Sequence, residues 1–182
     1  MARFSLSAVG ADRPGIVAAV TAALADAGCN LQDSTMAILQ GQFAIMLVLD
    51  ASDDTTDADL QVAVAPAASA LELTVSVRPL PPPPAPTGTG AEPDAEPWVL
   101  SIHGADRPGI VAAVTAALAD AGGNIVDLVT HVVGPADAPV YTMTVRATLP
   151  AASAAAGAER IRAAAARLGV HCAVHRDDAD LL

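Results

Sequence analysis

A stretch of 21 residues occurs twice in this chain of 182 residues, and 20 of its 21 positions are identical between the copies. The first copy begins at Gly10 and reads GADRPGIVAAVTAALADAGCN, and the second begins 94 residues later at Gly104. The one difference is Cys29, which is replaced by Gly123 in the second copy. Solenoids need about three or more repeats to bury their core. The repeat therefore predicts two similar domains in tandem.

A proline-rich segment lies between the two copies. Eight of the 19 residues from 79 to 97 are proline, and proline both lacks an amide donor and favours the extended polyproline conformation. This segment is therefore predicted to be an inter-domain linker rather than a helix or a central strand. The expected division is a first domain at 1–79, a linker at 80–97, a second domain at 98–176 and a short acidic tail at 177–182.

Apolar residues recur with the same periods in both halves. Ile16, Val20 and Leu24 follow at intervals of four, as on one face of a helix, whereas residues 3–9 alternate between apolar and polar as in a strand. The first half is predicted to hold strand 3–9, helix 14–27, strands 31–39 and 42–49, a helix from 56 or 57 to 70, and strand 73–77. The second half is predicted to hold strand 98–103, helix 108–121, strands 124–133 and 140–148, helix 153–168 and strand 170–175.

The order βαββαβ, present twice, is that of the split-βαβ, ferredoxin-like arrangement. We therefore predict an α+β fold with two antiparallel sheets, each with its helices on one face. Alternate residues from Phe43 to Leu49 line one face of their strand, and Ala44, Met46 and Val48 line the other, so both faces are apolar. A strand that is apolar on both faces is normally covered on both faces by other parts of the protein. We expect that the halves pack together or that a second chain covers the open faces.

The charge of the chain excludes two classes of partner. It carries 20 Asp and Glu residues against nine Arg and no Lys, for a formal net charge of −11. Direct binding of nucleic acid needs a basic surface that neutralises phosphates, and an anionic membrane attracts the same kind of surface. We therefore expect neither direct nucleic-acid binding nor membrane binding.

The chain is expected to be soluble and cytoplasmic. Its longest apolar run, Phe43–Leu49, is far shorter than the roughly 20 residues that cross a bilayer. The segment Met1–Gly10 alternates like a strand and lacks the apolar core of a signal peptide. Cys29 and Cys172 are too few for a disulfide scaffold.

The repeated segment Gly10–Ile16 joins the end of a strand to the start of a helix. Helix N-termini leave N–H groups unpaired and carry a partial positive charge, so they accept carboxylates and phosphates. Asp12 and Arg13 suit the ammonium and carboxylate groups of an amino acid, and Gly15 allows close approach. A purely structural joint is the other interpretation, with Asp12 as the helix cap, Pro14 in the first turn and Arg13 paired with an acidic neighbour. On the residues alone, the structural interpretation comes ahead of the ligand site, which stays open as the alternative.

The stretch from Ala11 to Leu49, with Asp-Arg-Pro-Gly followed by Gly-x-Asn, resembles an ACT domain. Two such segments joined by a proline-rich linker are similar to the glycine cleavage system repressor family, and the resemblance covers about 160 residues. The amino-terminal domain of formyltetrahydrofolate deformylases carries a similar segment. The resemblance implies a regulatory protein that binds a small amino acid at an interface between two ACT domains, either within one chain or in a homo-oligomer. The ligand-facing residues that it implies are Asp12, Arg13, Pro14, Gly15, Ile16, Asn30, Asp106, Arg107, Pro108, Gly109, Ile110 and Asn124.

The resemblance also implies that the chain acts through a protein partner rather than through DNA, in agreement with its net charge. Leu128–His131 of the second copy replaces Ser34–Ala37 of the first, so the two sites are not expected to be equivalent. Two alternatives stay open: a protein-interaction module without a ligand, and a regulatory subunit of an amino-acid metabolic enzyme.

No catalytic residue, metal site or cofactor is predicted, and the chain is not expected to be an enzyme. No Ser or Thr stands in a nucleophile elbow or beside a repeated His. Cys29 is expected to be a small, mostly buried residue, and His103 a structural one. On a strand, His171 and His175 would lie about 13 Å apart, which is too far for one ion with Zn–N bonds of about 2 Å.

Overall fold

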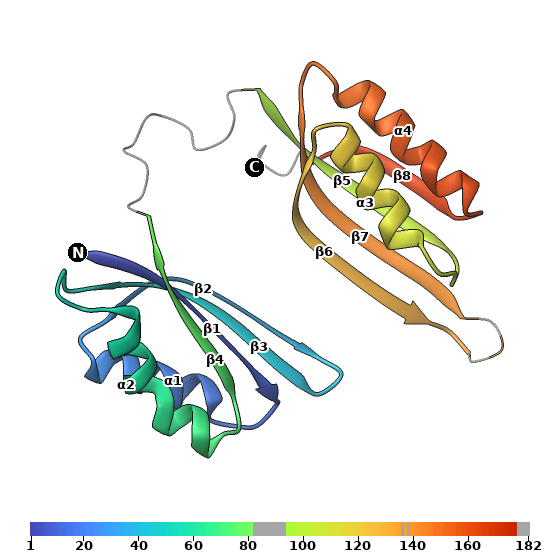
Figure 1. Cartoon of the computed structure of the whole chain (residues 1–182). Coiled ribbons are helices and arrows are strands. Elements are labelled where there is room, and N and C mark those ends of the chain that lie inside the picture. The colour runs from blue at the N-terminus through green and yellow to red at the C-terminus, as the bar shows by residue number, and fades with distance from the viewer. Residues whose placement is uncertain (82–93, 136, 138, 178–182) are drawn as a thin grey trace. The chain divides into compact units, whose positions relative to one another are not determined.

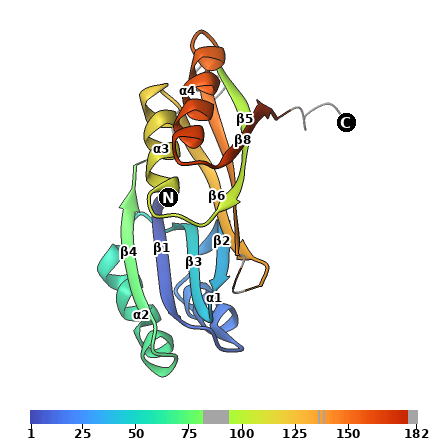
Figure 2. The same cartoon turned by 90° about the vertical axis from the view of Figure 1, so that its right-hand side faces the viewer.

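Both halves of the chain fold into a four-stranded antiparallel sheet with two helices on one face (Figures 1 and 2). The computed structural model describes residues 1–81, 94–135, 137 and 139–177, and the chain divides into two units, Met1–Ala85 and Pro86–Leu182. The element order is βαββαβ in each unit. The predicted α+β, ferredoxin-like fold is confirmed.

The elements follow the predicted periodicities within a few residues. The first unit contains β1 (Ala2–Ala11), α1 (Ile16–Asp26), β2 (Asn30–Leu39), β3 (Gln42–Ala51), α2 (Asp57–Ala70) and β4 (Thr74–Leu80). The second unit contains β5 (Ala95–Ala105), α3 (Ile110–Asp120), β6 (Asn124–Val133), β7 (Val140–Pro150), α4 (Ala154–Arg167) and β8 (His171–Arg176). None of the helices found in these parts of the chain is both long enough and apolar enough to span a membrane.

The strand order places the first strand of each unit in the interior of its sheet. The order is β2-β3-β1-β4 in the first unit and β6-β7-β5-β8 in the second. The hairpin between β2 and β3 turns at Gln40–Gly41, which has φ values of 51° and 76°, as a two-residue hairpin turn requires. The register pairs Gly10 with Phe43 and Gly104 with Tyr141. Corresponding positions of the two units can therefore be matched by their place in the sheet.

Each unit has its own core between the sheet and the helices. In β3, Phe43, Ile45, Leu47 and Leu49 are at most 6% exposed, because they pack against α1 and α2. Full burial of a side chain of this size contributes about 1.5–3 kcal/mol. On the opposite face Met46 is 55% exposed, so the apolar residues there are not covered within their own unit. The expected cover by the other half or by a second chain stays a prediction.

The first helix of each unit begins two residues later than the periodicity predicts. Gly15 has a φ of 93° and is the N-cap of α1, and Gly109 has the same φ at the start of α3. Glycine adopts this left-handed conformation at little cost, so the helix starts at Ile16, and Pro14 lies before it rather than in its first turn. No side chain caps either helix. The structural interpretation in which Asp12 caps α1 is therefore wrong.

The strands that border the predicted linker are longer than expected. β4 reaches Leu80 and β5 starts at Ala95, and both residues lie within the segment 80–97. β4 accommodates Pro79 because it is an edge strand, where proline is tolerated. Residues 82–93 of the predicted linker and 178–182 of the predicted acidic tail lie outside the described residues.

Candidate ligand-binding site

Each copy of the repeated loop leads from a strand in the interior of the sheet into a helix. A Cβ at Gly10 would lie 2.7 Å from Leu73 Cδ2, so this glycine lets the loop pack closely against the chain before β4. Gly15 is different, because nothing lies within 4 Å of the position that its Cβ would take. The start of α1 is therefore open on this side, and no side chain caps its first N–H groups. Such a helix start can accept an anionic group.

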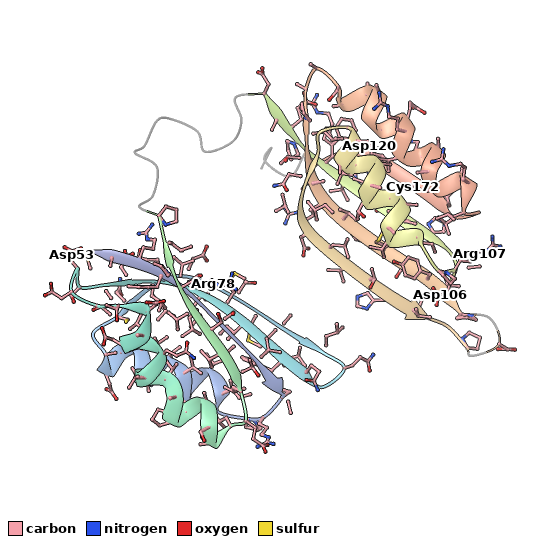
Figure 3. All side chains as sticks on the ribbon, in the orientation of Figure 1. Asp53, Arg78, Asp106, Arg107, Asp120 and Cys172 are labelled. Atoms are coloured by element: carbon pink, nitrogen blue, oxygen red, sulfur yellow. The ribbon has the colours of Figure 1, made fainter. Side chains whose placement is uncertain are left out.

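The loop arginines reach the segment that follows the second helix of their unit, but they meet different groups there. Arg13 forms an ion pair with the Glu72 carboxylate. Arg107 Nη1 donates to the carbonyl of Leu168 at 3.2 Å, which is a favourable contact at the C-terminus of α4. Figure 3 labels Arg107 and Asp106 on this loop. Among the described residues, Arg107 has no carboxylate at ion-pair distance.

A hollow of about 360 Å³ lies at the second loop. Asp106, Arg107 and the start of α3 from Gly109 to Ala112 line it, together with Tyr141 of β7. Tyr141 is 7% exposed, and its hydroxyl donates to Met143 Sδ at 3.5 Å. Burial raises the pKa of the Tyr141 hydroxyl, and the nearby Asp106 carboxylate adds to this. The hydroxyl is therefore a neutral polar group whose pKa is affected by the nearby Asp106 carboxylate, in a hollow that Arg107 also lines.

The asparagines implied by the resemblance lie away from the loops of their own units. Asn30 pairs with Asp50, which pairs with Arg3 at the start of β1, whereas the loop follows Gly10 at the other end of that strand. Seven residues of strand span about 23 Å at about 3.3 Å each. Asn124 stands at the corresponding end of the second sheet. Asn30 and Asn124 therefore do not lie next to the loop of their own unit.

The strand register brings together two histidines that are far apart in the sequence. His103 on β5 lies opposite His171 on β8, and their rings stack with centroids 4.8 Å apart and an interplanar angle of 27°. Sequence reasoning missed this pair, because only the pairing of β5 with β8 reveals it. Across residues 1–81, 94–135, 137 and 139–177, no three His, Cys, Asp or Glu side chains are grouped so that they could hold a metal ion.

Both cysteines are free and half-buried. Cys29 packs against the core of the first unit. Burial raises the pKa of the Cys29 thiol and that of the Cys172 thiol, and a thiol with a raised pKa holds little of the nucleophilic thiolate at neutral pH. Cys29 is therefore a packing residue, although it is less buried than expected.

Comparison with known families identifies both units. Residues 3–78 match the ACT domain family, and residues 98–166 match it a second time. A solved structure of an unknown protein from Galdieria sulphuraria has a TM-score of 0.79 and 30% identity to this chain, and the match covers 96% of this chain and 98% of that one. A protein assigned as a glycine cleavage system transcriptional repressor has a TM-score of 0.65 at 18% identity, with 96% of each chain covered. At 18% identity, the similarity to this second structure shows that the two proteins share a fold.

Curated relatives match over shorter stretches. The chain is 43% identical over 47 residues to the glycine cleavage system transcriptional repressor of Escherichia coli K12, which is 26% of this chain and 25% of that protein. It is 38% identical over 53 residues to a UPF0237 protein of Methanopyrus kandleri, which is 29% of this chain and 59% of that protein. The aligned stretches thus span between a quarter and three fifths of these relatives. Because the family matches twice, on two sheets of the same topology, the chain belongs to the ACT domain family as a tandem pair related to the glycine cleavage system transcriptional repressor.

Proposed function

We propose that this chain is a non-enzymatic regulator that senses a small amino acid between two ACT domains and passes the bound state to a protein partner. The observation that carries the proposal is the repeated loop, which places an Asp, an Arg and an uncapped helix start on one short segment. The Arg and the helix start complement a carboxylate, and the Asp complements an ammonium group. The proposed ligand-facing residues are Asp12–Ile16 and Asp106–Ile110, with Asn30 or Asn124 from the facing domain.

We propose that the facing domain belongs to a second copy of the chain, with an intrachain pair as the alternative. All ten residues of β2 are exposed, and Leu31, Met36, Ile38 and Leu39 among them are apolar. Natural sheets normally cover or interrupt an edge of this kind. Two copies that pair β2 with β2 about a twofold axis would satisfy the backbone groups and cover these apolar side chains together.

The proposed output is a contact with a protein. A net charge of −11 supports this choice over direct contact with nucleic acid. The E. coli relative is named a transcriptional repressor, and we propose that this chain regulates transcription in a similar way, through a DNA-binding partner. The ligand would stabilise one arrangement of the ACT domains, because only a difference in affinity between two arrangements can shift their populations.

A thermal-shift screen of the full chain against the twenty protein amino acids at millimolar concentration tests the proposal. A ligand at one hundred times its dissociation constant adds about 2.7 kcal/mol of stability, which raises the melting temperature of a domain of this size by roughly 5 °C or more. A shift with one amino acid or a few related ones supports a sensor. A flat screen contradicts amino-acid sensing and favours an interaction module without a ligand.

A further inference from the structure

The two loops have the same sequence from Gly10 to Ile16 and from Gly104 to Ile110, so any difference in what they bind comes from their surroundings. One such difference lies just after the second helix of each unit. Glu72 directly follows the C-cap of α2 with a φ of 55°, and Gly169 directly follows the C-cap of α4 with a φ of 70°. Glu72 and Gly169 therefore occupy the same position in the fold.

The residue at this position, Glu72 or Gly169, determines which group the loop arginine contacts. Glu72 supplies a carboxylate to Arg13, whereas Gly169 has no side chain and Arg107 donates to a backbone carbonyl instead. A Cβ built on Gly169 would lie 3.1 Å from Arg107 Nη1, so the guanidinium lies within reach of any acidic side chain at this position. A ligand carboxylate must displace Glu72 at the first loop, but it breaks no ion pair with a described residue at the second.

The second difference lies in the wall of the hollow. Phe43 and Tyr141 hold the same register position, opposite Gly10 and Gly104. Tyr141 is nine-tenths buried and lines the hollow. Its hydroxyl has only the sulfur of Met143 as a hydrogen-bond partner among the described residues, and sulfur is a weak acceptor. Buried hydroxyl groups normally have a stronger partner, which a polar group of a ligand in the hollow would supply. Phe43 has no hydroxyl group, so it cannot form such a hydrogen bond.

We propose that the second loop is the amino-acid site and that the first loop is closed by Glu72. Arg107 receives the ligand carboxylate, Asp106 receives the ammonium group, and the Tyr141 hydroxyl contacts a further polar atom of a small amino acid. This inference rests on the proposed function, because it assigns the amino acid to one of the two loops. It predicts one ligand per chain rather than two.

The test uses the full chain and, as probe, whichever of the twenty amino acids stabilises it most in the thermal-shift screen. Calorimetric titration with that amino acid gives the stoichiometry and the dissociation constant for Arg13→Gln, Arg107→Gln and Arg78→Gln. Arg78 is an exposed arginine of β4 and controls for the loss of one positive charge. Gly169→Glu and Gly169→Gln form a matched pair, because they differ in charge but have nearly the same size and backbone strain.

We expect one site per chain and a dissociation constant that rises at least about tenfold in Arg107→Gln, since a charge-assisted hydrogen bond is lost. Arg13→Gln should change it less than about threefold, as for an arginine already paired at the surface. Gly169→Glu should bind more weakly than Gly169→Gln. Two equal sites per chain, equal losses in the two loop arginine variants, or equal binding by the two Gly169 variants would overturn this inference alone. A wild-type chain that no amino acid stabilises would overturn the proposed function as well.

Discussion

The single difference between the two copies of the repeat is a difference in packing. Gly123 stands where the first copy has Cys29. A Cβ at Gly123 would lie 2.7 Å from Leu118 Cδ1 and 2.9 Å from Leu149 Cδ2, which is closer than real Cβ contacts come. Both leucines are at most 1% exposed, so they are held by the core on every side. Even one added methyl group must therefore displace packed side chains.

We expect Gly123→Ala to lower the free energy of unfolding of the second unit by about 1–2 kcal/mol. Overpacking a core costs about 1–3 kcal/mol, and the reduced freedom of the unfolded chain offsets about 0.4–1 kcal/mol of that cost. Urea denaturation of the full chain, followed by tryptophan fluorescence, measures this unit alone. Trp98 is the single tryptophan of the chain, and it packs against the core of the second unit.

Two variants check the reasoning behind this number. Leu118→Ala alone should cost about 2–5 kcal/mol, but with Gly123→Ala the total should fall short of the sum, because the new methyl group no longer meets the leucine. Cys29→Ala changes the matching position of the first unit, so it should leave the urea unfolding transition that Trp98 fluorescence reports unchanged. An unchanged or higher urea midpoint for Gly123→Ala would refute the argument, since Leu118 would then have moved aside at no cost.

Three further outcomes are expected. Thr56→Ala removes the capping box of α2 and should destabilise the first unit by about 1 kcal/mol, measured by circular dichroism in urea; no loss would mean that the cap contributes nothing. Hydrogen bonds from the Arg3 guanidinium lower the pKa of the Asp50 carboxyl, so this stabilisation is present above the unfolded pKa of about 3.9 and is lost as the pH falls through the lower folded value. Arg3→Gln should therefore flatten the acid side of a melting-temperature profile, and an equally steep profile would contradict this. Ile38→Lys should turn a dimer into a monomer in analytical ultracentrifugation, whereas Val62→Lys, at an exposed position of α2, should not; a dimer in both variants would exclude the β2 interface.

Features that depend on residues close together in the chain were predictable. The start of α2 is set by Thr56, whose hydroxyl accepts from the amide of Asp59 three residues later. The hairpin at Gln40–Gly41 needs two residues with positive φ, and these residues stand between two apolar runs. The period of two along β3 likewise predicts that Phe43 and Ile45 share one face of the strand, although both faces are apolar and only the structure shows that this face is the core. In each case the physical signal lies within one turn, one hairpin or one strand.

The loop before α1 shows where such local signals stop. Asp12 and Pro14 look like the cap and first turn of a helix, but Gly15 takes a left-handed conformation and starts the helix at Ile16. A glycine is compatible with either geometry, so its type does not decide its φ. Only the folded structure shows which geometry Gly15 adopts, and Gly109 adopts the same one at the start of α3.

The sequence by itself determined the duplication, the βαββαβ order and the residue types of the loop, because repeats and periodicities are properties of short stretches. Only the tertiary structure decided that Asn30 lies at the far end of the sheet from its own loop, that Glu72 pairs with Arg13, and that His103 stacks on His171. Each of these placements follows from strand register and from how the helices end, which bring together residues distant in the chain. Two identical loops thus acquire different surroundings.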